Sequence, residues 1–391
     1  MAPVHDEGAD ESAAYDGDRI DEHSSPTVVV GLLCDPGLPS DIVRTFIDDL
    51  EADLSAQVTD EVGWDVRMRT EPLRIDAENQ VPLVNLSRLV RPKYRWDLLV
   101  CVTDLPRQLG TNPVVADISV DSGAALASLP ALGAWRLRKR LRDTVLYLIG
   151  ELGKSRILER PAGRERREVG GKLRPVRWVD HPDAEIEVSL ALVGWRGRLR
   201  LLAGMIRDNK PWRLVPELST ALAAGSAAAA FGIFYGSIWA LADALSPLRQ
   251  MFISLLAMGS MVVWLILYNR LWERRSASKE KTILYNASTV ASLLCGVAAA
   301  YLVLFAVSFV GAFTVIEPDY LGQSLGHPAG IVEYLKLAWL SSSLGTFAGA
   351  LGSSLESEDA VYRAAYSRRE RQRRQHARQR REQEEREHHE E

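Results

Sequence analysis

The 391-residue sequence predicts two architectures in one chain: a mixed-sheet α/β domain, followed by an all-α transmembrane bundle of four helices. Two observations predict this division. Short β-branched apolar runs alternate with amphipathic helical patterns between residues 26 and 153, which is typical of α/β folds. Four long apolar stretches without charged residues follow after residue 217. The average composition, 47% hydrophobic and 25% charged, conceals this separation.

The α/β domain is predicted over residues 26–153. Its first strand, Thr27–Cys34, is a β-branched apolar run that ends at an Asp-Pro-Gly turn, and a helical pattern follows over 40–54. Residues 71–95 contain several prolines and show little pattern. The other predicted elements are strands at 64–70 and 97–103, a hairpin of 114–120 with 124–129, and a helix over 134–152.

Residues 154–194 are predicted to form a basic linker and a second hairpin, with strands at 174–179 and 185–193. Residues 195–215 follow as a basic amphipathic segment. Its helix, predicted over 195–207, has one apolar side and one arginine-rich side, a pattern typical of helices in the headgroup layer of a membrane. An amphipathic helix packed on the α/β domain would show the same pattern.

Both ends of the chain are strongly charged. Residues 1–25 carry eight acidic side chains against one arginine and almost no aliphatic residue, which predicts a disordered acidic tail. Residues 356–391 form a charged tail that is rich in arginine and then in glutamate. The arginines of this tail could contact anionic lipid, and they are not interleaved with the aromatic residues that stack on nucleic acid bases. The net charge of −4 also argues against nucleic acid as a partner.

The transmembrane domain is predicted over residues 216–355. A helix of about 20 residues crosses a hydrocarbon core of about 30 Å, and each charge-free stretch approaches or exceeds that length. The third stretch is much longer, which indicates a non-spanning end or a strong tilt. The four stretches are Leu218–Ala242, Gln250–Asn269, Thr282–Ile316 and Leu337–Leu355.

The basic residues between these stretches predict the orientation. Residues 195–215 and 270–281 are rich in Arg and Lys, whereas the connections at 243–249 and 317–336 are not. Basic loops remain on the cytoplasmic side of a membrane. The sequence therefore predicts a multi-pass protein of the cell (plasma) membrane with both termini in the cytoplasm and the α/β domain in the cytosol.

Small residues at helical spacing occur in two predicted spans. Gly232 and Gly236 lie in the first, and Gly345 and Gly349 lie in the fourth. Such pairs let helix backbones approach closely, either across a homo-oligomer interface or within the bundle. The spans contain no Asp, Glu, Lys, Arg or His, which argues against a proton relay or a secondary transporter.

Three carboxylates are candidate ligands at one edge of the predicted sheet. Asp35 and Asp104 follow two apolar strands, and Asp117 lies in the first hairpin. If the two strands are parallel neighbours, Asp35 and Asp104 meet at the edge where α/β sheets bind ligands, and they could hold Mg²⁺. The alternative is turn chemistry, in which each aspartate bonds to its own backbone. No phosphate-binding loop, dinucleotide fingerprint or nucleophile elbow is present, and no cofactor is predicted.

Four arginines near the first span are candidate contacts for anionic lipid headgroups. Their guanidinium groups would project from the amphipathic segment toward the inner leaflet. They are Arg196, Arg200, Arg207 and Arg213.

Segments 95–107, 114–133 and 197–215, which read RWDLLVCVTDLPR, VVADISVDSGAALASLPALG and GRLRLLAGMIRDNKPWRLV, resemble a family of uncharacterised actinobacterial membrane proteins. That resemblance implies no particular activity. The order of strand, Thr-Asp-Leu strand, hairpin and helix is also similar to archaemetzincin-like zinc proteases, whose helix carries His-Glu-x-x-His. The corresponding stretch here, TVLYLIGELG at 144–153, contains no histidine, which excludes zinc protease activity.

The sequence thus favours a membrane-anchored cytosolic module that binds or regulates an unidentified protein or small ligand. A membrane-bound enzyme with an acidic site at the sheet edge is one alternative, and a channel or transporter subunit is another.

Overall fold

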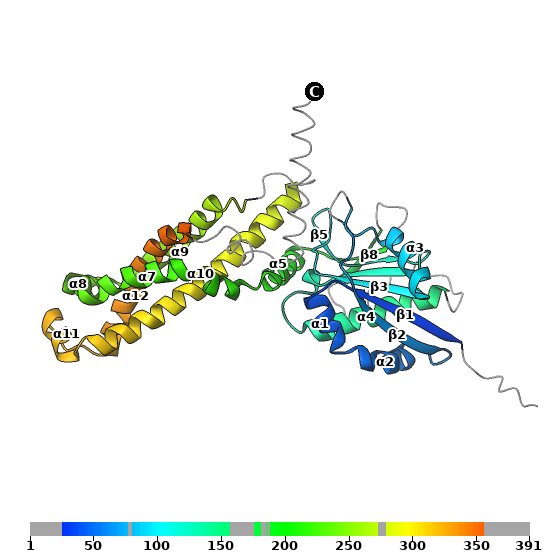
Figure 1. The fold of residues 1–391 in the computed structure, drawn as a ribbon, viewed down its shortest axis with the longest axis horizontal. Coiled ribbons are helices and arrows are strands. Elements are labelled where there is room, and N and C mark those ends of the chain that lie inside the picture. Colours follow the sequence, from blue (N-terminus) through cyan, green and yellow to red (C-terminus); the bar gives the residue numbers. More distant parts are fainter. Residues whose placement is uncertain are drawn as a thin grey trace, which may run out of the picture.

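A computed structural model describes residues 26–76, 80–156, 176–180, 186, 188–272 and 279–355. An α/β domain is joined to an elongated helical region, and the two follow one another end to end along the longest axis of the molecule (Figure 1). The predicted acidic tail, the charged tail after 355 and most of the linker at 154–175 lie outside the described residues.

The α/β domain is built on one mixed sheet, as predicted. Its principal strands run in the order β2-β1-β3-β6-β5-β8-β7, with β4 paired to β5. The first four in this order are parallel neighbours, and β5, β8 and β7 continue the sheet in antiparallel pairs. The strands are β1 (Thr27–Cys34), β2 (Gly63–Thr70), β3 (Leu98–Thr103), β4 (Gln108–Leu109), β5 (Asn112–Ser119), β6 (Ala124–Ser128), β7 (Val176–Asp180) and β8 (Val188–Leu192).

The second predicted hairpin, β7 and β8, joins this same sheet. Strand β8 pairs with β5 over residues 188–191, and β7 pairs with β8 at the sheet margin. The sheet therefore continues across the predicted division at residue 153, because the inward residues of β8 need the apolar cover that the domain already provides.

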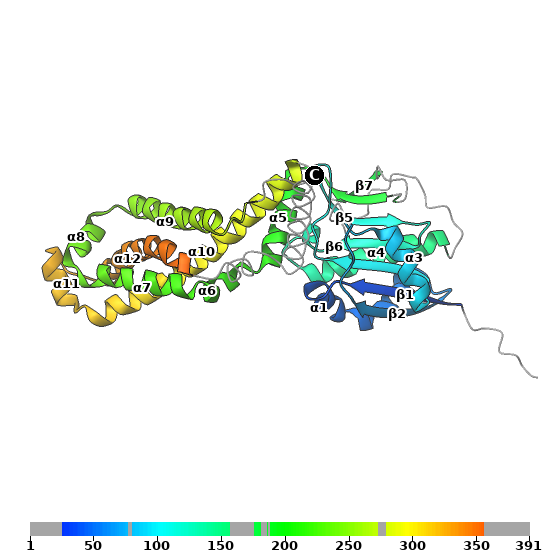
Figure 2. The same cartoon turned by 45° about the horizontal axis from the view of Figure 1, so that its top comes forward.

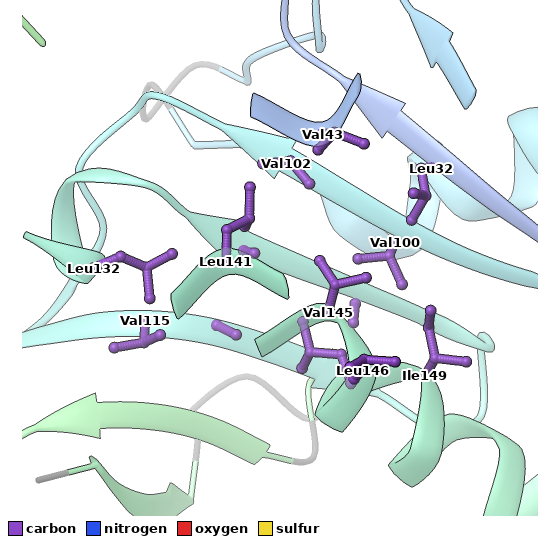
Figure 3. Close-up of a cluster of buried hydrophobic side chains, with 14 of the residues drawn as sticks. Leu32, Val43, Val100, Val102, Val115, Leu132, Leu141, Val145, Leu146 and Ile149 are labelled. Carbon is purple, nitrogen blue, oxygen red and sulfur yellow. The ribbon is translucent and has the colours of Figure 1, made fainter. Parts of the chain in front are cut away.

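Helices cover both faces of the sheet. On one face lie α1 (Leu38–Arg44), α2 (Leu50–Gln57) and the long α4 (Leu137–Arg156). Figure 3 shows Leu141, Val145 and Ile149 of α4 against the sheet residues Val100 and Val102. The other face is covered by α3 (Leu83–Tyr94).

Two helices differ from the sequence prediction. The helix expected over 40–54 is divided by a 3-10 turn at Ile47–Asp49, after the Thr45 hydroxyl bonds to the carbonyl of Ile42 and ends α1. Helix α3 was not predicted, because Pro82 and Pro92 suggested loops. Pro82 precedes the first helical residue, where no N–H is needed for a helical bond, and Pro92 lies inside the helix two residues before its end at Tyr94.

The helical region begins with α5 (Trp195–Asn209), which lies across the junction between the two parts (Figure 2). Short turns follow at η3 (Pro211–Arg213) and α6 (Leu214–Glu217). The remaining helices are α7 (Ser219–Phe234), α8 (Gly236–Ala244), α9 (Pro247–Tyr268), α10 (Lys279–Val315), α11 (Pro318–Leu325) and α12 (Ile331–Gly352).

Helices α9 and α10 are long and apolar enough to cross a membrane, and a third span arises if the bent pair Trp195–Glu217 and Ser219–Phe234 counts as one. This result supports membrane association. The first predicted span, however, is not one helix: the backbone of Tyr235 is extended and separates α7 from α8. The indole of Trp239 donates to the carbonyl of Ile233 at 3.0 Å, which satisfies a group freed by the break.

Candidate functional site at the domain junction

Asp35, which was expected at an acidic edge of the sheet, forms hydrogen bonds within the protein. Asp35 is fully buried at the end of β1, and its two carboxylate oxygens accept from the backbone N–H of Leu73 at 2.9 Å and the hydroxyl of Thr103 at 2.6 Å. Strands β1 and β3 are parallel neighbours as expected, but Cys34 is level with Val102. The neighbour of Asp35 across the strands is therefore Thr103 rather than Asp104. Asp35 fastens the segment after β2 to the end of β3.

Asp117 does not belong to this edge. It lies within β5, which is separated from β3 by β6. Its carboxylate is buried, forms an ion pair with Arg107 Nε at 2.6 Å and accepts from the hydroxyl of Ser189 at 2.6 Å. Nowhere in the described part of the chain do three or more His, Cys, Asp or Glu side chains form a group that could hold a metal ion.

The cysteines of the sheet are core residues. Burial, reinforced by the nearby Asp35 carboxylate, raises the pKa of the Cys34 thiol to about 12. Burial likewise raises the pKa of Cys101 well above its ordinary value. Neither sulfur is a thiolate at neutral pH, so neither is a ready nucleophile.

Helix α5 is the element that connects the two parts of the molecule. Its small-residue face packs on the η2 turn (Pro130–Leu132) of the α/β domain, where a Cβ on Gly204 would overlap the carbonyl of Pro130. On its opposite side Trp195 and Leu199 remain exposed. The helix thus packs on the domain along one face and leaves an apolar stripe uncovered along the other.

The four predicted lipid-contacting arginines divide into two pairs. Arg196 and Arg213 are exposed, and the Arg196 guanidinium lies over the ring of Trp195. Arg200 and Arg207 instead turn toward the α/β domain. Arg200 Nε donates to the carbonyl of Leu132 at 3.2 Å, and Arg207 Nη1 donates to that of Gly133 at 2.8 Å.

The end of α5 contacts α10 through polar groups. The Asn209 side-chain amide donates to the hydroxyl of Ser292 at 2.9 Å, with Ser288 at 3.5 Å. One turn further along α10, a Cβ on Gly296 would lie 2.9 Å from the carbonyl oxygen of Pro211. The beginning of α10 is therefore a docked segment, which accounts for the excess length of the third apolar stretch.

Three of the four predicted glycines serve contacts within the chain. Helices α7 and α12 are antiparallel, and a Cβ on Gly345 would lie 2.5 Å from the carbonyl oxygen of Gly225. Gly349 similarly faces the carbonyl of Ala221, and Gly232 faces Ser341. Gly236 begins α8 and meets no atom of the described residues within 4 Å of a Cβ, so it does not form a packing pair with Gly232.

Polar residues inside the helical region bond to one another. The hydroxyls of Ser254, Tyr301 and Ser343, from α9, α10 and α12, lie 3.0–3.1 Å apart, and the indole of Trp339 donates to Ser254 at 2.6 Å. The sequence prediction missed this network, because isolated serines in an apolar run carry no periodic signal. The network joins three helices.

A charged cluster ties together the two connections farthest from the α/β domain. Asp243 accepts from His327 Nε2 at 2.9 Å and from Lys336 Nζ at 2.9 Å. These bonds lower the pKa of Asp243. The bond to Asp243, helped by the carbonyl of Pro328, raises the pKa of His327. The cluster links the end of α8 to His327, which precedes α12, and to Lys336 within α12.

No protein-family model matches the chain, and comparisons with curated proteins and with solved structures find no similar protein. The resemblances to actinobacterial membrane proteins and to archaemetzincin-like folds stay predictions.

Proposed function

We propose that this is a multi-pass protein of the cell membrane whose α/β domain is held at the cytoplasmic face as a binding or regulatory module. The observation that carries the proposal is helix α10. It runs without a break from its contact with α5 to the far end of the helical region, so that one rigid element belongs to both parts.

The surface of the helical region supports a membrane environment. Large apolar side chains cover its outside, among them Phe252 and Leu267 on α9 and Val310 on α10. Exposed patches of this extent on a soluble monomer are rare. Beyond Gly296, the 19 residues 297–315 of α10 extend about 28 Å, close to the thickness of a hydrocarbon core.

Exposed aromatic rings with polar atoms mark both ends of this apolar surface. Trp212, Tyr268 and Trp272 lie at the end near the α/β domain, and Tyr235 and Tyr320 at the other end. Tyr and Trp favour the two interfaces of a bilayer. Together with the basic segments at 195–215 and 270–281, this arrangement supports the inside orientation of the α/β domain.

A bundle of four spans forms part of the proposal. Helix α12 contacts α7, α9 and α10 and is the most enclosed of these helices. Ser341, Ser342 and Ser343 make it less apolar than α9 or α10, and a helix shielded from lipid by its neighbours tolerates that composition.

The two alternatives gain less support. Asp35 and Asp117 are both occupied by protein partners, which argues against an acidic catalytic edge. The hydroxyl groups between α9, α10 and α12 bond to each other, as expected of packing contacts rather than a pore lining.

Labelling of intact cells tests the proposal. Cys295 is replaced by serine, and single cysteines are introduced at Tyr320 and at Trp272, which are both exposed. A membrane-impermeant maleimide should label position 320 in intact cells, and position 272 only after the membrane is opened. Labelling of position 272 from outside would contradict the proposed orientation.

A further inference from the structure

Two arginines from different helices converge on the η2 turn. Arg140 of α4 donates through Nη1 to the carbonyl of Leu132 at 2.8 Å, and Arg200 of α5 donates through Nε to the same oxygen at 3.2 Å. A Cβ on Gly133 would lie 2.8 Å from Arg200 Cγ and 3.3 Å from Arg140 Nη1. The two guanidinium groups are thus neighbours, and glycine at position 133 leaves room for both.

These two charges have no acidic partner among the described residues. The adjacent Arg207 pairs with Asp208 at 2.5 Å, but neither Arg140 nor Arg200 forms an ion pair in that part of the chain. A guanidinium group has five N–H donors, and each of these two uses one in bonds to described residues. Burial and the like charge of Arg140 lower the pKa of Arg200 to about 10.

The beginning of α4 adds to the positive charge around Arg140. Helix N-termini carry partial positive charge and favour acidic residues, yet the first turn of α4 contains no acidic residue and holds Arg140. Arg136, just before it, has a left-handed backbone with φ of 52°. A bound anion would offset the repulsion among these charges.

The hydrogen bonds to the η2 carbonyls use only some of the guanidinium donors at this position. The carbonyl of Leu132 accepts from both arginines, and the carbonyl of Gly133 accepts from Arg207. The remaining N–H donors of these two neighbouring guanidinium groups come from two helices. An anion with three or more oxygens has enough acceptors for both groups, which favours a phosphate over a carboxylate.

We infer that Arg140 and Arg200 form a binding site for a phosphate group, carried either by a lipid headgroup or by a soluble phosphorylated molecule. The inference rests on the proposed function and names the ligand class of the module. Exposed apolar side chains lie on both elements that carry the two arginines: Trp195 and Leu199 on α5, and Trp135, 81% exposed, just before α4.

The test compares melting temperatures of the full-length protein and of the variants Arg140→Gln, Arg200→Gln and Arg138→Gln. Arg138 is the matched control, because it lies in the same turn of α4 but donates to the carbonyl of Thr45. Each protein is measured in neutral detergent with chloride or with millimolar inorganic phosphate at equal ionic strength. Each is also measured in nanodiscs of phosphatidylcholine with or without phosphatidic acid.

Phosphate or phosphatidic acid should raise the melting temperature of the wild type and of Arg138→Gln by about 3 °C, and this rise should vanish in Arg140→Gln and Arg200→Gln. A higher melting temperature in inorganic phosphate identifies a soluble ligand. A higher melting temperature only in nanodiscs with phosphatidic acid identifies a lipid headgroup. Equilibrium dialysis of radiolabelled phosphate and native mass spectrometry of retained lipid repeat the comparison for a variant that melts too early. Equal responses of all four proteins to both probes would overturn the inference. Labelling of positions 272 and 320 in the same variants tests the proposed orientation separately.

Discussion

The side-chain amide of Asn209 lies 2.9 Å from the hydroxyl oxygen of Ser292, and this hydrogen bond joins the last turn of α5 to α10. Both residues are buried. A buried amide that loses its partner is destabilising by about 1–3 kcal/mol, so the pair fixes how α10 lies against α5. The α/β domain is thereby attached to the helical region by a defined contact and not only by the chain connection.

The contact between α7 and α12 is predicted to be sensitive to one methyl group. The substitution Gly345→Ala forces a Cβ against the carbonyl of Gly225 and should destabilise the protein by about 1–3 kcal/mol. The control, Gly236→Ala, places its methyl group in open space among the described residues and should change stability by less than about 0.5 kcal/mol. Thermal unfolding in detergent measures both. Equal effects would mean that α7 and α12 do not pack as described.

Asp35 is predicted to stabilise the fold and not to bind a metal ion. The substitution Asp35→Asn weakens the bonds to Leu73 N and to the Thr103 hydroxyl and should lower the free energy of unfolding by about 1–3 kcal/mol. Addition of Mg²⁺ should leave the melting temperature of the wild type unchanged. A stabilising effect of Mg²⁺ that disappears in Asp35→Asn would instead restore the acidic metal site.

The pair of Asp243 and His327 predicts a pH dependence. Asp243 raises the folded-state pKa of His327, so protonation is favoured by folding. The stabilisation is fully present below the ordinary histidine pKa near 6.5 and is lost as pH rises through the raised folded value. Asp243→Asn should flatten the fall in melting temperature between about pH 6 and pH 8, where histidine titrates. An unchanged slope would show that the pair does not contribute.

The two buried thiols are predicted to be inert in the folded protein. With the pKa of Cys34 raised to about 12, alkylation by iodoacetamide near pH 8 should proceed only after denaturation, for Cys34 and for Cys101. Mass spectrometry of the native and denatured protein measures this. Rapid modification of Cys34 under native conditions would contradict its place in the sheet core.

The elements of the fold can be predicted where the apolar residues form a clear strand or helix pattern in the sequence. Strand β1 was predicted with the bounds that the structure has, because its β-branched run ends at Asp-Pro-Gly. Helix α3 was missed because Pro92 conceals the spacing of Leu83, Leu86 and Val90, which are all buried. The break at Tyr235 was missed because charge-free composition measures apolar length and not helix continuity.

The candidate site was harder to predict than the fold. That Asp35 follows a strand is visible in the sequence, but its partner Leu73 is 38 residues away and not in a regular element. Arg140 and Arg200 belong to two basic runs that the sequence shows separately. Only the η2 turn, to which both bond, brings them together.

Distance measurements between spin labels test most directly whether the α/β domain and the helical region form one coupled unit. The labels are placed at Lys139→Cys in α4 and Trp272→Cys beyond α9, both exposed, with Cys295 replaced by serine. In membranes, the wild-type background should give one narrow distance distribution, and Asn209→Ala should broaden it. A distribution that is already broad in the wild-type background, and is unchanged by Asn209→Ala, would contradict the account.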